Sequence, residues 1–159
     1  MTDLPVAQTI QPPGQWHGAA AHCSLTYEQR FFRRKKLTVS EGWSFVADFA
    51  HTVSLNAGDA LQLDDGRLVE IRSAPEALLA VSGKNLPRLA WHIGNRHTPC
   101  QIEDHRLLIQ DDPVIAHMLA HLGADVAAIT EPFTPEGGAY GHGRTHSHDH
   151  GHTAHDHAH

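Results

Sequence analysis

Apolar and polar positions form short strand-like stretches between about residue 25 and residue 71. Turn residues separate these stretches, and Asp65-Gly66 is a strong hairpin signal between residues 60–63 and 67–71. Such short strands predict a small all-β domain over residues 1–74, ended by the break at Ala74-Pro75. Residues 1–14 predict a loose lead-in to this domain.

A helical period replaces this pattern in the second half of the chain. Leu86, Leu89, Ala90 and Ile93 recur three or four positions apart and predict a helix with one apolar face. Asn85 is a suitable cap for that helix, and a proline is tolerated in its first turn.

A second helix is predicted after Asp112, a capping residue followed by a proline, and Gly123 ends it. Its predicted apolar face consists of Val114, Ile115, Met118, Leu119 and Leu122. Strands are predicted over residues 76–81, 101–110 (with room for two) and 125–129. The β-α-β-β-α-β order predicts a ferredoxin-like domain over residues 75–136, so the chain belongs to the α+β class.

Composition excludes several classes of protein. The net charge of −6 argues against a nucleic-acid partner, and two cysteines without CxxC spacing argue against a zinc ribbon or a disulfide scaffold. No stretch is long and apolar enough to span a membrane, and the first residues lack the features of a signal peptide, so a cytoplasmic protein is expected. The basic run at residues 33–36 is interpreted either as a solvated strand edge or as a docking patch for an acidic protein surface.

Catalytic motifs are not found in the sequence. It has no phosphate-binding glycine loop, no nucleophile elbow and no H-E-x-x-H zinc motif, so the protein is predicted not to be an enzyme. Cys100 is interpreted as a half-buried structural cysteine rather than a nucleophile. His117 and His121 stand four residues apart and could share a metal ion, but no third ligand accompanies them.

His97 continues the apolar stripe of the first predicted helix, after Leu86, Ala90 and Ile93. One interpretation is a hydrogen-bonded core histidine. The other is a side chain that is exposed until two copies of the chain meet, where a two-fold axis would place the two imidazoles opposite each other as half of a metal site. The pattern alone leaves both interpretations open.

The last residues, 137–159, predict a disordered tail because they contain almost no apolar side chains. Eight histidines stand among the final eighteen residues: His142, His146, His148, His150, His152, His155, His157 and His159. Imidazole suits nickel, copper and zinc, so the tail is predicted to bind such ions without selecting among them. A purely solubilising tail and a pH switch are the alternatives.

Three segments together resemble the UreE family, the nickel metallochaperones among the urease accessory proteins. They are WHIGNRHTPCQ at residues 91–101, DPVIAHMLAHLG at 112–123 and EPFTPEGGAY at 131–140, followed by the histidine-rich tail. The resemblance covers most of the chain past about residue 25.

The resemblance implies a cytoplasmic homodimer with an N-terminal β domain for protein contacts and a ferredoxin-like metal-binding domain. It implies that the protein delivers Ni²⁺, as cargo, to the urease apoprotein together with a GTPase and further accessory proteins; Zn²⁺ and Cu²⁺ are other ions it could bind. The family's interfacial nickel ligand falls on His97, and His142 and His146 are expected to complete the coordination.

One position departs from the family. Some members carry an extra histidine pair just before the second helix, where this chain has Asp111 and Asp112 instead. That secondary site is expected to be lost or rebuilt with these carboxylates. Two other functions remain as alternatives. One is a general divalent-metal buffer that acts through its tail. The other is a metal-regulated folding helper of the prolyl isomerase type, which the predicted order of elements disfavours.

Overall fold

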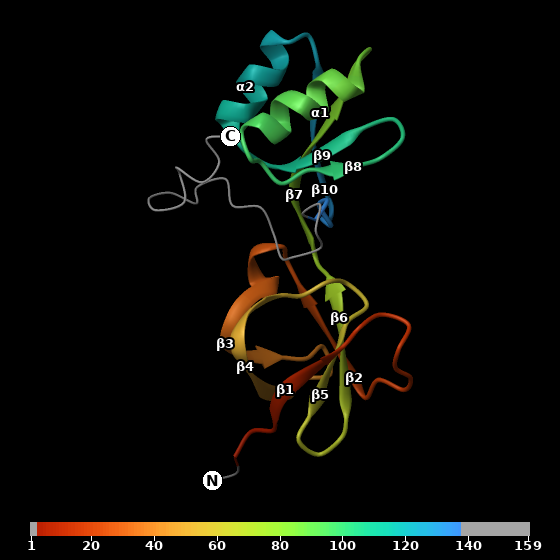
Figure 1. Ribbon diagram of the computed structural model, residues 1–159, viewed down its shortest axis with the longest axis vertical. Helices are drawn as coiled ribbons and strands as arrows, with labels where there is room; N and C mark the ends of the chain where they lie inside the picture. Colours follow the sequence, from red (N-terminus) through yellow and green to blue (C-terminus); the bar gives the residue numbers. More distant parts are fainter. Residues whose placement is uncertain (1–2, 138–159) are drawn as a thin grey trace. The chain divides into compact units, whose positions relative to one another are not determined.

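The computed structural model describes residues 3–137 of the 159-residue chain. Its contacts divide into two compact units. The first contains the residues up to Glu76 together with Pro132–Thr134, and the second contains Ala77–Glu131 together with the described residues from Pro135 onward. Strands dominate the first unit, whereas the second combines helices with strands (Figure 1), so the predicted α+β class is confirmed.

Six strands form the sheet of the first unit in the order β2-β6-β5-β1-β4-β3. Their bounds are β1 Val6–Gln11, β2 Ala21–Leu25, β3 Phe31–Thr38, β4 Ser44–Ser54, β5 Ala60–Leu63 and β6 Leu68–Ser73, with a 3-10 turn at Glu28–Arg30. The predicted hairpin between β5 and β6 is present. Gly66 adopts a φ of 90° there, and its N–H donates to the carbonyl of Leu63 over 2.9 Å.

The core of this unit follows from period-two alternation along the strands. In β4 the side chains of Phe45, Ala47 and Phe49 are buried on one face, while the positions between them are half-buried. Val69 and Ile71 of β6 are fully buried in the same cluster. The alternating pattern is therefore what defines the inner face of the sheet.

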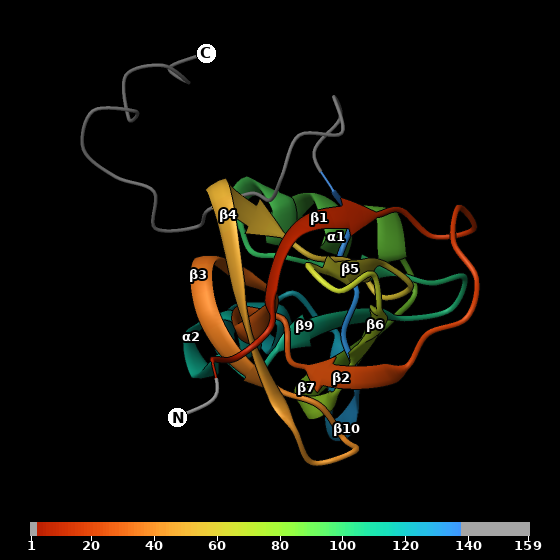
Figure 2. The same cartoon turned by 90° about the horizontal axis from the view of Figure 1, so that it is seen from below.

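The prediction of a loose lead-in at residues 1–14 is wrong. These residues contain β1, which pairs in parallel with β4 and antiparallel with β5 (Figure 2), and Ala7 is fully buried. A register shift between Ala7 and Thr9 interrupts the alternation of buried and exposed residues. Pairing on both edges stabilises this strand although its side chains show no clear alternating pattern.

The second unit contains the predicted β-α-β-β-α-β order. Its elements are β7 Pro75–Ser82, α1 Leu86–Asn95, β8 Gln101–Ile102, β9 Leu107–Gln110, α2 Pro113–His121 and β10 Asp125–Pro132. The sheet order is β10-β7-β9-β8, and β8 pairs antiparallel with β9. The second middle strand expected between residues 101 and 110 is therefore present. None of the helices in the described range is long and apolar enough to cross a membrane.

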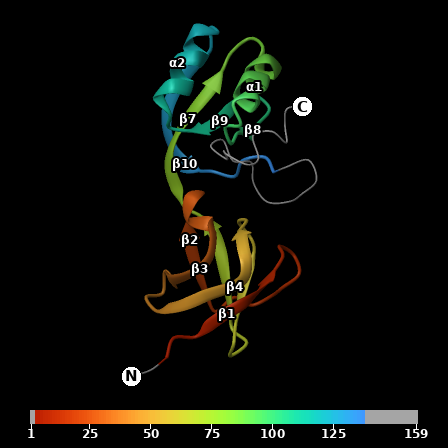
Figure 3. The same cartoon turned by 60° about the vertical axis from the view of Figure 1, so that its left-hand side comes forward.

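Both helices pack on one face of this sheet (Figure 3). Alternate residues of the two central strands share that face, and each helix contributes two buried side chains to it, at i and i+4. The buried cluster consists of Leu79, Val81, Leu107 and Ile109 from the strands and Leu89, Ile93, Ile115 and Leu119 from the helices. Val114, predicted to be on the buried face of α2, is 64% exposed because that face is centred on Ile115 and Leu119.

Candidate functional site

Helix α1 begins as its sequence predicts. The side-chain oxygen of Asn85 accepts a hydrogen bond from the backbone N–H of Arg88 over 3.2 Å, and Pro87 stands in the first turn, where its missing N–H costs nothing. Leu89 and Ile93 are buried against the sheet. These contacts fix the position of the helix and, through it, of the loop that follows.

The helix ends in a Schellman motif centred on His97. The N–H of His97 donates to the carbonyl of Gly94 over 2.9 Å, and the N–H of Thr98 donates to that of Ile93 over 3.3 Å. His97 has a φ of 57°, in the left-handed region that glycine normally occupies at this position of the motif. A β-carbon in this conformation costs about 1–2 kcal/mol, so His97 occupies a strained backbone position.

His97 is exposed, which excludes the interpretation as a core histidine. The left-handed residue turns the chain away from the helix axis, so the apolar stripe of α1 does not continue beyond Asn95. Trp91, on the same helix, is 62% exposed, and its ring contacts that of His92 edge-on at 5.0 Å between centroids. Helix α1 and the loop after it thus present the large apolar ring of Trp91 and the side chain of His97 on the surface of this unit.

Cys100 follows His97 by three residues, and its surroundings disfavour the thiolate form. Burial of its side chain, with a smaller contribution from the nearby Glu136 carboxylate, raises the pKa of the thiol to about 11. Forming the thiolate, which is the form that binds a metal, therefore costs more here than at an ordinary cysteine. The prediction that Cys100 is a half-buried structural residue agrees with its position.

The segment that leads to the tail returns to the loop of His97. The backbone N–H of Glu136 donates to the carbonyl of Cys100 over 2.8 Å. The histidine nearest to that bond along the tail, His142, is six residues further on. The hydrogen bond therefore fixes the start of the tail a few residues from His97.

An ion-pair network holds the end of β10 in this unit. Arg106 binds Glu131 through both of its terminal nitrogens, at 2.7 and 3.2 Å, and its Nε donates to Glu103 over 2.7 Å. Hydrogen bonding to Arg106 lowers the pKa of the Glu131 carboxyl from its usual range. Arg106 lies on the turn between β8 and β9, so the network connects that hairpin to the strand from which the chain leaves.

The described residues contain no ready-made set of metal ligands around a single point. His117 and His121 are exposed on α2, and no group of three potential metal-binding side chains is found within residues 3–137. Asp112 caps α2, accepting hydrogen bonds from the N–H groups of Val114 (2.9 Å) and Ile115 (3.2 Å). The predicted ligands His142, His146, His148, His150, His152, His155, His157 and His159 lie outside the described residues.

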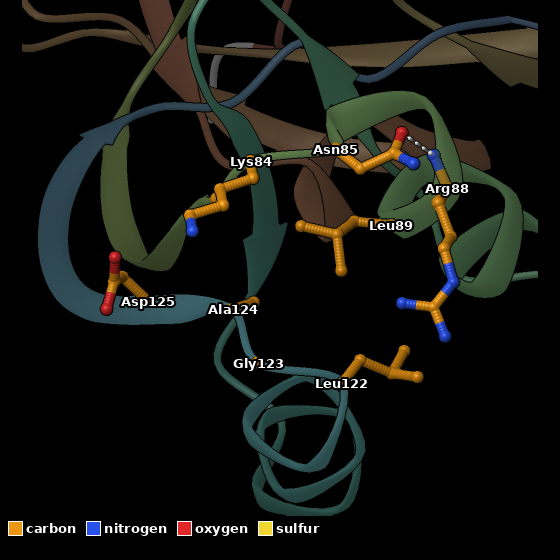
Figure 4. A pocket seen from close by; sticks show the side chains of 9 residues that line it. Lys84, Asn85, Arg88, Leu89, Leu122, Gly123, Ala124 and Asp125 are labelled. Atoms are coloured by element: carbon orange, nitrogen blue, oxygen red, sulfur yellow. Dashed lines mark hydrogen bonds between the residues drawn. The ribbon is translucent and has the colours of Figure 1, made fainter.

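A pocket of about 410 Å³ lies near the start of α1, away from His97 in the sequence. Its side chains include Lys84, Arg88 and Asp125 around an apolar part formed by Leu89 and Leu122 (Figure 4). His97 is not among its lining residues. The pocket is therefore a feature distinct from the candidate metal ligand.

Two features of the site were not predicted from the sequence. The first is the histidine at the position of a Schellman motif that glycine usually occupies. The sequence indicates it only weakly, through the lack of a glycine just after the predicted helix. The second is the hydrogen bond between Glu136 and Cys100, which joins two backbone groups and is therefore not predicted by any pattern of side chains.

Comparison with known proteins matches both halves of the chain to one family. Residues 4–74 match the model of the UreE urease accessory protein N-terminal domain, and residues 69–159 match that of the C-terminal domain. The chain is 57% identical over 148 residues to the urease accessory protein UreE of Ruegeria pomeroyi, a match that covers 93% of this chain and 99% of the relative.

Two further relatives carry the same name. The chain is 56% identical to the Cereibacter sphaeroides protein over 152 residues (95% of this chain, 83% of the relative) and 54% identical to the Rhodobacter capsulatus protein over 145 residues (91% and 92%). The resemblance expected from the three sequence segments is thereby confirmed. This chain belongs to the UreE family of urease accessory proteins.

Proposed function

We propose that this protein is a nickel metallochaperone, not an enzyme, which binds Ni²⁺ in the cytoplasm and delivers it for maturation of the urease active site. Membership in the UreE family supports the role in urease maturation. Nickel is the cargo, which the protein hands on by ligand exchange. A GTPase and other accessory proteins, together with the urease apoprotein, are the partners in this proposal.

The geometry of His97 is the observation that carries the proposal. Its side chain is exposed, its N–H is bound to the carbonyl of Gly94, and its φ is strained. Such strain tends to persist at functional positions, where something other than stability maintains it. An exposed imidazole on a backbone held in place in this way is a suitable ligand for nickel, and also for zinc or copper.

A homodimer supplies the second ligand in this proposal. A two-fold axis near the end of α1 would place His97 of one copy opposite His97 of the other. The exposed ring of Trp91, on the same helix, supports this arrangement because a second copy could cover it.

The tail supplies the remaining ligands. The hydrogen bond from Glu136 to Cys100 supports His142 and His146 as the residues that complete the coordination, because the six residues from Glu136 to His142 span at most about 20 Å. The later histidines of the tail collect ions and pass them to this site.

The division of the chain supports a division of roles. The β-α-β-β-α-β order with strand order β10-β7-β9-β8 supports a ferredoxin-like domain for metal binding and dimerisation, over residues 75–136. The β domain, residues 1–74, is proposed to handle contacts with partner proteins. The histidine-rich tail, residues 137–159, is proposed to be the third part.

Nickel titration tests the proposal on the full chain and on a chain without residues 141–159, each in its original sequence, as His97→Ala, and as His117→Ala, a matched control on an exposed histidine. Calorimetry gives the number of ions, and light scattering gives the mass. The shortened dimer should still bind about one ion through its two His97 side chains, but more weakly than the full chain because it lacks His142 and His146. His97→Ala in that shortened chain should lose the ion. His117→Ala should retain it.

Urease activation in a reconstituted system distinguishes delivery from buffering. His97→Ala in the full chain should reduce activation more than it reduces the number of bound ions. If the shortened chain binds no nickel, or if His97→Ala activates urease fully, the proposed site is wrong and a tail-based metal buffer is the better description.

A further inference from the structure

The basic run at residues 33–36 lies on β3, the last strand of its sheet. β3 pairs with β4, and no other strand of residues 3–137 pairs with it. Figure 1 shows it beside β4 in the unit that contains the first residues. An edge strand presents a row of backbone N–H and C=O groups to which another chain can bind.

The open part of this edge has definite limits. The regular register with β4 runs from Arg34, opposite Asp48, to Thr38, opposite Ser44. Near Thr38 the edge is approached by β2, since the N–H of Ser40 donates to the carbonyl of His22 over 2.8 Å. Residues 34–37 therefore form the open stretch, about 13 Å long at roughly 3.3 Å per residue.

This edge is strongly positive although the whole chain is negative. Four consecutive cations stand on β3, and the strand contains no acidic residue. Asp48 of β4 accepts bonds from both Arg33 (3.5 Å) and Arg34 (3.1 Å), so two of the four cations share one carboxylate. The side chains of Arg33 and Arg34 are 53% and 60% exposed, and Lys36 is exposed as well.

An apolar ring stands next to these charges. Phe31, the first residue of β3, is 37% exposed, and Phe32 packs partly against the core while the Lys35 ammonium lies 5.9 Å from its ring centre. A ligand that combines acidic and apolar side chains therefore meets complementary groups along one strand.

We propose that the edge of β3 docks an acidic, extended segment of a partner protein, which adds to the sheet as a further strand. Backbone hydrogen bonds to residues 34–37 would supply affinity for any extended chain, and the cations would select acidic ones. The proposal does not rest on nickel binding, because β3 and His97 belong to different units.

Protein is favoured over nucleic acid as the partner. A nucleic acid has no backbone groups that could continue a β-ladder, and a net charge of −6 repels a polyphosphate at long range. Charged side chains on an edge strand also commonly serve only to prevent aggregation. Binding measurements separate these possibilities.

The test uses the full chain labelled with ¹⁵N and a nine-residue peptide of alternating glutamate and valine, blocked at both ends. The backbone amides of residues 34–37 should shift on titration, and the affinity should fall as salt is added. A peptide with lysine in place of glutamate, a peptide with proline in place of valine, and a single-stranded DNA of twenty thymidines are the comparison ligands.

Two double variants with the same change of charge provide the matched control. Arg34→Gln with Lys36→Gln should weaken the binding of the glutamate peptide about fivefold, since each exposed charge pair contributes little. Lys84→Gln with Arg88→Gln, on the other unit, should leave it unchanged. Nickel titration of both variants should match the unaltered chain.

Four results would overturn the proposal. They are unshifted amides on β3, equal weakening by both double variants, binding of the proline peptide as tight as that of the valine peptide, and tighter binding of the DNA. If the shortened chain without these substitutions binds no nickel while the full chain binds the glutamate peptide, the result counts against the proposed function alone.

Discussion

Replacing His97 by glycine and by alanine separates the two properties that meet at this residue. Both variants remove the imidazole, but only glycine adopts a φ of 57° without a clash at the β-carbon. The left-handed conformation costs an alanine about 1–2 kcal/mol. The greater freedom of glycine in the unfolded chain offsets roughly 0.5–1 kcal/mol of this. We therefore expect His97→Gly to be more stable than His97→Ala by about 0.5–1 kcal/mol.

Gly94 offers the matched control. It lies inside α1, its φ is not in the left-handed region, and a β-carbon added there meets no atom within 4 Å. Alanine should accordingly be better than glycine at this position, by about 0.8–1 kcal/mol. Glycine should thus be the more stable of the two residues at position 97 and alanine the more stable at position 94.

Urea unfolding followed by circular dichroism measures both differences. A chelator must be present, and the protein concentration must be constant, because bound metal and dimerisation would stabilise the chain by mass action. The reasoning is refuted if alanine is as stable as glycine at position 97 while Gly94→Ala is stabilising. Both substitutions at His97 should lose the nickel ion of the shortened dimer equally, so glycine would improve the fold while removing the ligand.

Three other predictions follow from the contacts of this unit. Asp112→Ala should cost about 1 kcal/mol in urea unfolding through loss of the α2 cap, whereas Asp111→Ala, at its exposed neighbour, should cost little. Because the pKa of Cys100 is raised from 9.0 to about 11, this thiol should react with iodoacetamide at pH 8 roughly a hundredfold more slowly than an ordinary thiol. Mass spectrometry of the peptide that contains Cys100 measures the rate, and reaction at the ordinary rate would contradict the burial. Glu131→Gln should lower the melting temperature at pH 7. Because Arg106 lowers the pKa of Glu131 in the folded state, this stabilisation is lost as the carboxyl takes a proton, so the difference between the two proteins should shrink as pH falls below the ordinary carboxyl pKa of 4.5. A difference that is constant with pH would exclude this ion pair as its source.

Local signals predicted the helices of this protein well. Asn85 and Asp112 cap α1 and α2 as expected, because a capping bond depends only on residues two or three positions away. The hairpin at Gly66 is similarly local. The strand order β10-β7-β9-β8 does not follow from any single local signal. It could be expected only because the β-α-β-β-α-β order of elements was predicted correctly.

Two of the wrong predictions depend on contacts between distant parts of the chain. β1 is stabilised by β4 and β5, far along the sequence, and its own residues do not alternate cleanly. The exposure of Val114 depends on how α2 is rotated against the sheet. For His97 the pattern left a buried and an exposed interpretation open. The buried one is excluded for a local reason, since the helix ends at Asn95 and the apolar stripe ends with it.

The hydrogen bond between Glu136 and Cys100 gives the tail its relation to His97. A ligand tethered by a short linker to a second ligand acts at an effective concentration in the millimolar range, and that concentration falls as the linker lengthens. In this chain the linker to His142 is counted from Glu136, which is bound to the loop of His97, and not from the end of β10. The first histidines of the tail therefore have the shortest linker to His97, and the later ones have progressively longer linkers. This difference in linker length is why we propose His142 and His146 for coordination and the histidines beyond them for the collection of ions.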